Sequence, residues 1–151
     1  MEMEIRPRVR VAGILIKDNK ILLIEHKKND KKYWLIPGGG VDWGESTAEA
    51  LIREYKEETN LDVIVEKFLF LSETIAPDKK KHVINLYFKI RKDENSKAEM
   101  ILGGESNLND LKFVSKEEIE TIKIYPNIKE QIKQLLDEKE IVPYLGLLWD
   151  K

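Results

Sequence analysis

The sequence predicts a layered α/β or α+β domain with a mixed sheet. Its 151 residues, 42% of them hydrophobic, suit a single domain with one core, which we take to span residues 1–151. Short apolar runs and helix-like segments are both present, and most of the strand-like runs precede the last helices. This order differs from the regular strand–helix alternation of a doubly wound fold.

Composition narrows the classes of function. The formal net charge of −2 gives no electrostatic reason to expect a nucleic-acid partner. The chain contains no cysteine, which excludes disulfides and thiolate chemistry and suits a reducing, cytoplasmic setting. The N-terminal segment "MEMEIRPRVR" lacks the apolar stretch of a signal peptide, and apolar runs such as "VAGILI" are too short to cross a bilayer. We therefore expect no membrane association.

The first third of the chain predicts three strands. "VRVAGILI" and "ILLIEH" are apolar runs joined by the tight polar turn "KDNK". "YWLIP" predicts a short strand that Pro37 ends. Two lysine-rich pieces, "KKNDKK" and "DKKKH", are interpreted as solvated loop tips rather than as a binding patch.

The later segments predict more strands and two further helices. "VIVEKFLFL" and "SETIAPDKKKHVINLYFKI" form a strand pair around a loop, and "NLNDLKFVSKEEIETI" is a strand that runs into a short helix. "PNIKEQIKQLLDEKE" predicts a longer helix with Pro126 at its start. Its apolar stripe consists of Ile128, Ile132, Leu135 and Leu136. The apolar tail 141–149 packs either on the core or on a second subunit, which leaves a homodimer open.

A helix between Ser46 and Asn60 holds the candidate functional residues. Ser46 and Glu49 have the spacing of a capping box, and Asn60 tolerates the left-handed conformation that ends many helices. At about 100° per residue the wheel predicts one stripe that packs on the sheet. That stripe consists of Ala48, Leu51, Ile52 and Tyr55.

Three carboxylates cluster beside that stripe. Glu54, Glu57 and Glu58 are related by three and four residues, and each close pair of like charges costs about 1 kcal/mol in water. One interpretation is a solvated helix face on which Arg53 pairs with Glu57. The other is that a divalent cation cancels the repulsion. Oxygen-only ligands select Mg²⁺ or Mn²⁺, and two histidines without cysteine make a zinc site a poor alternative.

The glycine-rich stretch "PGGGVDWGES" precedes this helix. Residues 39–46 match a phosphate-binding P-loop except that Glu45 stands in place of the lysine. A carboxylate there would repel phosphate, so a P-loop kinase or NTPase is a poor choice. The dinucleotide fingerprint also fails, because its last glycine falls on Trp43.

Together, the loop and the helix resemble the signature of the Nudix hydrolases: Gly, five residues, Glu, seven residues, then Arg-Glu-aliphatic-x-Glu-Glu-x-Gly-aliphatic. Tyr55 replaces the preferred aliphatic residue and Asn60 replaces the last glycine, and neither change removes a charge. Looser similarity extends to "WLIPGG", "LKFVSKEEI" and "IYPNIKEQI". The matching residues are Gly39, Glu45, Arg53, Glu54, Glu57, Glu58 and Leu61.

The resemblance implies an α/β/α sandwich around a mixed sheet and a Mg²⁺- or Mn²⁺-dependent hydrolysis of nucleoside diphosphates linked to another group. It implies that Glu54, Glu57 and Glu58 are metal ligands and that the Gly38 carbonyl adds another. Arg53 would orient the glutamates, with Gly39 and Glu45 supporting the ligands from behind. The small-molecule nucleotide substrate would be split at its pyrophosphate bridge.

Many members of the family also use an acidic residue on a later loop as a base or as an extra ligand. Glu105 in "GGESNLND" is the candidate by position, so the catalytic set becomes Arg53, Glu54, Glu57, Glu58 and Glu105. Asp110 and Glu99 are alternatives to Glu105, and a solvated loop is the competing interpretation of Glu105 itself.

The substrate is less constrained than the reaction. Pro77 lies sixteen residues after Leu61, where the family's ADP-ribose pyrophosphatases carry a proline, and this favours an ADP-ribose-like substrate. A nucleoside triphosphate pyrophosphohydrolase and a catalytically silent nucleotide sensor remain alternatives. Trp34, Trp43 and Tyr33 are candidates either to stack on a base or to pack in the core.

Overall fold

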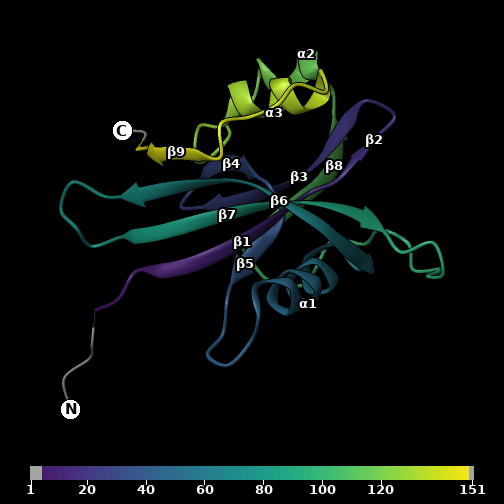
Figure 1. Cartoon of the computed structure of the whole chain (residues 1–151), viewed down its shortest axis with the longest axis horizontal. Helices are drawn as coiled ribbons and strands as arrows, with labels where there is room; N and C mark the ends of the chain where they lie inside the picture. Colours follow the sequence, from purple (N-terminus) through teal and green to yellow (C-terminus); the bar gives the residue numbers. More distant parts are fainter. Residues whose placement is uncertain (1–4, 150–151) are drawn as a thin grey trace.

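The computed structural model describes residues 5–149. In that part of the chain, two β-sheets lie between one helix on one side and two helices on the other (Figure 1). The elements are β1 (Arg8–Ile14), β2 (Ile16–Lys17), β3 (Lys20–Lys28), β4 (Lys31–Leu35), β5 (Gly38–Gly40), α1 (Thr47–Thr59), β6 (Val63–Ile75), β7 (His82–Lys92), β8 (Leu108–Val114), α2 (Lys116–Ile119), α3 (Lys129–Leu136) and β9 (Tyr144–Leu147).

The first sheet is mixed, as the sequence predicts. Its strand order is β5-β1-β7-β6-β9. β1 pairs with β5 antiparallel and with β7 parallel, while β6 pairs with β7 antiparallel and with β9 parallel. The predicted strand pair around a loop is confirmed as the long β6–β7 hairpin. β5 is the edge strand of this sheet and pairs with β1, so the glycine stretch is held alongside β1.

The chain passes from the first sheet to the second at Leu15. Ile14 and Leu15 are both buried, but they belong to cores on opposite sides of the sheets. The predicted strand "VRVAGILI" is therefore divided into β1 and β2, and this part of the prediction was wrong. The predicted turn is confirmed, since Asp18 and Asn19 both have positive φ and close a two-residue hairpin from β2 to β3.

The second sheet is built around β3. Ile21 pairs with both Ile16 and Val114, so β2 and β8 lie on opposite edges of β3. Ile24 pairs with both Leu35 and Leu111, which places β4 on the same edge as β2. The predicted strand and short helix after residue 107 are confirmed as β8 and α2.

Successive side chains of β1 point to opposite faces of the sheet, so this strand contributes to two apolar cores. Val11 belongs to the apolar cluster under α1, with Leu51 and Tyr55, whereas Ala12 belongs to the cluster under α3, with Ile132. Figure 1 shows α1 on one side of the sheets and α2 and α3 on the other. The α/β/α sandwich that the resemblance implies is therefore present.

The ends of α1 are as predicted, but its buried stripe is confirmed only for Leu51 and Tyr55. Ser46 Oγ accepts a hydrogen bond from the Glu49 N–H, and Asn60 ends the helix with φ of 64°. Ala48 is only half-buried and Ile52 is 42% exposed. The buried face is therefore rotated away from the predicted stripe, and it includes Glu58 and Thr59 in the last turn of the helix. The buried residues of α1 are Ala50, Leu51, Tyr55, Glu58 and Thr59.

The last helix and the tail both pack on this chain's own core. α3 begins at Lys129, three residues later than Pro126, and it buries Ile132 and Leu136 as predicted. The apolar tail adds β9 to the edge of β6, and Ile141, Leu145 and Leu148 pack against the core. A homodimer stays a prediction. Across residues 5–149, the structure contains no helix of the length and apolarity needed to span a membrane.

Candidate functional site

The glycine stretch forms a strand that must approach its neighbours closely. A Cβ added to Gly38 would overlap the Val11 carbonyl of β1, and one added to Gly39 would overlap the Glu54 carboxyl group of α1. Only glycine therefore lets β5 fit between β1 and the helix. The stretch serves as a close-packed support for α1, and the turn after it passes through Gly44, whose φ is 85°.

Glu58 is a buried carboxylate beside this strand. Its side-chain oxygen Oε1 accepts a 2.8 Å hydrogen bond from the Gly38 N–H, and the residue is only 5% exposed. Burial raises the pKa of Glu58 to about 7, and the nearby charges of Glu54 and Glu105 add to that rise. A carboxylate in this position is costly unless a positive charge compensates for it.

Arg53 forms hydrogen bonds with three glutamates of the signature, Glu45, Glu54 and Glu57. Its Nε and Nη2 atoms donate to the two oxygens of Glu45, at 2.8 and 2.7 Å, and Nη2 also donates to the Gly40 carbonyl at 3.1 Å. Its Nη1 atom donates to Glu54 at 2.8 Å and to Glu57 at 3.5 Å. The predicted Arg53–Glu57 pair is therefore confirmed, although it is the longest of these contacts.

The residues of the signature differ in their electrostatic state. The Arg53 guanidinium and then the Asp42 N–H lower the pKa of Glu45 to about 2. Burial raises the pKa of Glu54, although Arg53 opposes that rise. Glu57 is exposed on the solvent side of the helix. Glu45 is thus a fixed anion that holds Arg53 in place, while Glu54 and Glu58 face the interior.

Glu58 is the glutamate of the signature to which Arg53 forms no hydrogen bond or ion pair in the described structure. The His26 imidazole lies beside it, with Nε2 3.9 Å from Glu58 Oε2, and the positive charge of Arg10 lowers the Glu58 pKa without cancelling the effect of burial. Burial and the charge of Arg10 lower the pKa of His26, so the imidazole is neutral near pH 7. In the described range, no three His, Asp or Glu side chains are grouped as metal ligands, so the convergence of Glu54, Glu57 and Glu58 on one ion stays a prediction.

Glu105, on the loop before β8, is the acidic residue whose negative charge affects the carboxylates of this site. Its charge contributes to the raised pKa values of Glu54 and Glu58. The loop is fixed to the end of α1 because the Gly103 N–H donates to the Glu58 carbonyl at 2.9 Å. Asp110 instead lies on β8 opposite Glu25, and the Glu99 side chain is exposed while its carbonyl accepts from Asn60.

Three residues at this site were missed from the sequence. Gly103 lies so close to α1 that an added Cβ would overlap the Glu57 carbonyl. Arg10 interrupts an apolar strand, and its Nη2 donates to the Ile36 carbonyl at 2.7 Å. His26 ends an apolar run. A charged or titratable residue within an otherwise apolar strand is the signal that could have identified Arg10 and His26.

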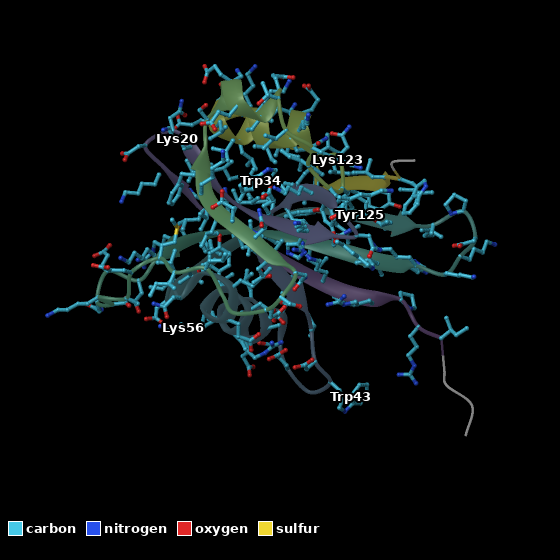
Figure 2. The ribbon with its side chains drawn as sticks, turned by 180° about the vertical axis from the view of Figure 1, so that it is seen from behind. Lys20, Trp34, Trp43, Lys56, Lys123 and Tyr125 are labelled. Atoms are coloured by element: carbon cyan, nitrogen blue, oxygen red, sulfur yellow. The ribbon has the colours of Figure 1, made fainter. Side chains whose placement is uncertain are left out.

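The three aromatic candidates differ in how exposed their side chains are. Trp34 is a core residue at 6% exposure, whereas Trp43 is 96% exposed at the tip of the glycine turn (Figure 2). Tyr33 is half-buried, and its ring lies against His26 with the centroids 5.8 Å apart. Tyr33 is thereby linked to the carboxylate site through His26, whose Nε2 lies 3.9 Å from Glu58 Oε2.

The fold, the glycine strand and the acidic helix define one class of protein. A family model described as the NUDIX domain matches residues 6–136, and the chain belongs to this family. It is similar to an ADP-ribose pyrophosphatase of Methanocaldococcus jannaschii, with 39% identity over 107 residues, and to the phosphatase NudJ of Escherichia coli, with 35% identity over 74 residues. These matches cover 70% and 49% of this chain.

The chain spans about half the length of these curated relatives, 58% of the first and 48% of the second. Among solved structures, a NUDIX hydrolase from Nitrosomonas europaea superimposes with a TM-score of 0.74. That match covers 89% of this chain and 92% of the other, at 20% identity. At that identity the similarity supports the fold alone.

The state of Glu58 predicts an unusual pH dependence of stability in the absence of divalent cations. The unfolded carboxyl loses its proton near pH 4.5, whereas the folded one keeps it until about pH 7. The folded state therefore binds more protons in this window, and this group's contribution makes stability fall as pH rises from 4.5 to 7. The loss is on the order of 3 kcal/mol. Urea unfolding in EDTA at a series of pH values measures it.

The matched control is Glu58→Gln, which has no titrating carboxyl at this position. The wild type should lose stability relative to the variant as pH rises through the window. Parallel pH profiles for the two proteins would contradict the assignment.

Proposed function

We propose that this chain is a Mg²⁺- or Mn²⁺-dependent pyrophosphohydrolase, which splits the pyrophosphate bond of nucleoside diphosphates linked to another group. The observation that carries the proposal is the buried Glu58 carboxylate, which has Glu54 and Glu105 nearby and whose pKa is raised to about 7 even though the charge of Arg10 lowers it. We also propose that residues 1–151 act as one domain, in the cytoplasm, on a small-molecule nucleotide.

The residues present fit a divalent cation. The candidate donors are all oxygens, from Glu54, Glu57, Glu58 and the Gly38 carbonyl, which suits Mg²⁺ or Mn²⁺. A cation would add positive charge beside Glu58, whose pKa is raised despite Arg10, and it would lower the pKa of that carboxyl. When bound, it would neutralise the negative charge of the pyrophosphate.

Groups of the chain itself would position the carboxylates and accept a proton. The Gly38 N–H fixes one oxygen of Glu58, and this leaves the other oxygen free to face a ligand. Arg53 holds Glu54 and, through its paired bonds to Glu45, keeps its own guanidinium in one orientation. Glu105 is the proposed base, because a carboxylate near the site can accept the proton of an attacking water.

The substrate class rests on two supports. Pro77 lies at the offset expected for ADP-ribose pyrophosphatases, and the Methanocaldococcus jannaschii relative carries that name. We therefore propose an ADP-ribose-like nucleoside diphosphate derivative ahead of nucleoside triphosphates.

A hydrolysis screen tests the reaction and the substrate together. ADP-ribose, nucleotide sugars, diadenosine polyphosphates and nucleoside triphosphates are incubated with the protein and with Mg²⁺ or Mn²⁺, and nucleoside monophosphate release is followed. ADP-ribose should be split in a cation-dependent reaction that EDTA stops. Binding of nucleotides without any turnover would instead support a silent sensor. Turnover that persists in EDTA would contradict the role of the cation.

A further inference from the structure

A second feature, which we name the lysine pocket, lies apart from the acidic helix. It has a volume of about 480 Å³ and is lined by Lys28, Lys31, Lys81, Lys123, Tyr33 and Tyr125, together with Asn29 and Trp149. Four lysines and no carboxylate line this pocket, although acidic residues outnumber basic ones in the chain as a whole. A pocket with this lining favours an anionic ligand that carries an aromatic or flat group.

The fold assembles the pocket from four separate segments, three of which carry its lysines. Lys28 and Lys31 flank the two-residue turn between β3 and β4. The Trp34 N–H donates to the Lys123 carbonyl at 2.8 Å, and this bond holds the segment of Lys123 and Tyr125 alongside β4 (Figure 2). The β6–β7 loop is closed by a bond from the Ala76 N–H to the Lys81 carbonyl, at 2.9 Å.

These contacts change the interpretation of the two lysine-rich loops. Both loops are exposed, as the sequence predicts, but Lys28 and Lys31 of the first and Lys81 of the second line the same pocket. None of the four lysines forms an ion pair within residues 5–149, whereas Lys116 and Lys133 elsewhere on the surface each pair with a carboxylate. Lys81 lies over the Tyr125 ring, with its Nζ 4.4 Å from the centroid. The positive charge of the pocket is therefore available to a ligand.

A row of aromatic rings joins the lysine pocket to the carboxylate site. His26, whose Nε2 is 3.9 Å from Glu58, lies 5.8 Å from Tyr33 between ring centroids, and Tyr33 lies 5.9 Å from Tyr125. His26 and Tyr33 face each other across the β3–β4 pair, so the row runs along the second sheet. The lysine pocket and the carboxylate site therefore lie at the two ends of one row of neighbouring rings.

Two buried polar atoms of this row have no hydrogen-bond partner within the described residues. They are His26 Nε2 and the hydroxyl oxygen of Tyr125. Buried polar groups normally have partners, so these two atoms are positions at which a polar ligand along the row could form hydrogen bonds.

We propose that, among nucleoside diphosphate derivatives, the site prefers one whose nucleoside carries an additional 2′- or 3′-phosphate over the unphosphorylated counterpart. The nucleoside lies along the aromatic row from His26 to Tyr125, and the additional phosphate binds in the lysine pocket. This assignment rests on the proposed function for the position of the pyrophosphate at the acidic helix. A phosphate monoester carries nearly two negative charges at neutral pH, and it would relieve the mutual repulsion of the lysines.

The test measures binding of hydrolysis products, so that it does not depend on turnover. Isothermal titration calorimetry in EDTA compares AMP with adenosine 2′,5′-bisphosphate and adenosine 3′,5′-bisphosphate. We expect at least one bisphosphate to bind about tenfold more tightly than AMP, because charge-assisted bonds to a phosphate are added. The double variant Lys81→Gln/Lys123→Gln should reduce this advantage to less than about threefold.

Lys67→Gln/Lys97→Gln is the matched control, since it removes the same charge from exposed lysines outside the pocket. This control should keep the full advantage of the bisphosphate, and thermal unfolding of both variants verifies their fold. Equal affinities for AMP and both bisphosphates in the wild type would overturn the proposal, as would an advantage that both double variants keep. Failure of the proposed function is separate, because it would appear as the absence of cation-dependent hydrolysis.

Discussion

Glu58→Gln is expected to lower the rate of pyrophosphate hydrolysis on the order of 10³-fold while the protein stays folded. The amide of glutamine still accepts the hydrogen bond from the Gly38 N–H, so the packing of β5 against α1 is kept. The charge that would bind a cation is lost. The substitution therefore separates the chemical role of the carboxylate from its structural one.

Two measurements make this separation visible. In EDTA at pH 8, the variant should be at least as stable as the wild type, because it no longer buries a charge at 5% exposure. With saturating Mg²⁺ or Mn²⁺, the wild type should show a rise in melting temperature that the variant lacks, since a cation bound only by the folded state stabilises it.

Glu49→Gln is the control on the same helix, where the side chain is exposed and only the backbone N–H takes part in the cap. It should keep both the turnover and the response to the cation. Full activity in Glu58→Gln would show that the buried carboxylate is not needed, and it would remove the observation on which the proposed function depends.

Arg53→Lys is expected to reduce turnover by about 10- to 100-fold, although it preserves the positive charge. Lysine cannot reproduce the paired bonds from Nε and Nη2 to Glu45 together with those to Gly40 and Glu54. Glu54 would then be free to adopt other orientations. We regard Arg53 as a positioning residue, so the loss should include weaker apparent affinity for Mg²⁺ or Mn²⁺.

An acid-unfolding experiment distinguishes this role from general packing. Arg53 lowers the pKa of Glu45 to about 2, so Glu45 contributes stability above pH 4.5 that is lost as pH falls towards 2. In Arg53→Lys this acid-dependent loss should become smaller. Arg91→Lys, which changes a surface ion pair to Glu94, should leave turnover, cation affinity and the acid profile unaltered. Normal cation affinity in Arg53→Lys would contradict the positioning role.

Much of the acidic helix could be predicted from the sequence, because its determinants are local. Ser46 and Asn60 define the ends of α1 by capping chemistry that acts within a few residues. The spacing of Glu54, Glu57 and Glu58 follows from the helical repeat alone. The rotation of the helix was predicted less well, since the burial of Ala50 and the exposure of Ile52 depend on where β1 and β5 meet it.

Residues far apart in the sequence could not be assigned in this way. Arg10, His26 and Glu105 lie on three different segments, and only the arrangement of β1, β3 and the loop before β8 brings them near Glu58. The lysine pocket has the same origin. Its lysines come from two hairpin turns and from the segment before α3, and each was locally indistinguishable from an ordinary solvated lysine.

The sequence by itself determined the family resemblance, the mixed α/β layers, the caps of α1 and the oxygen-rich character of the site. These depend on residue chemistry and on spacings within one element. The tertiary structure decided which carboxylate is buried, that the glycine stretch is a strand packed on β1, and that the apolar tail pairs with β6. These features depend on contacts between distant segments, since burial and strand pairing are properties of the assembled layers and not of any one stretch of the chain.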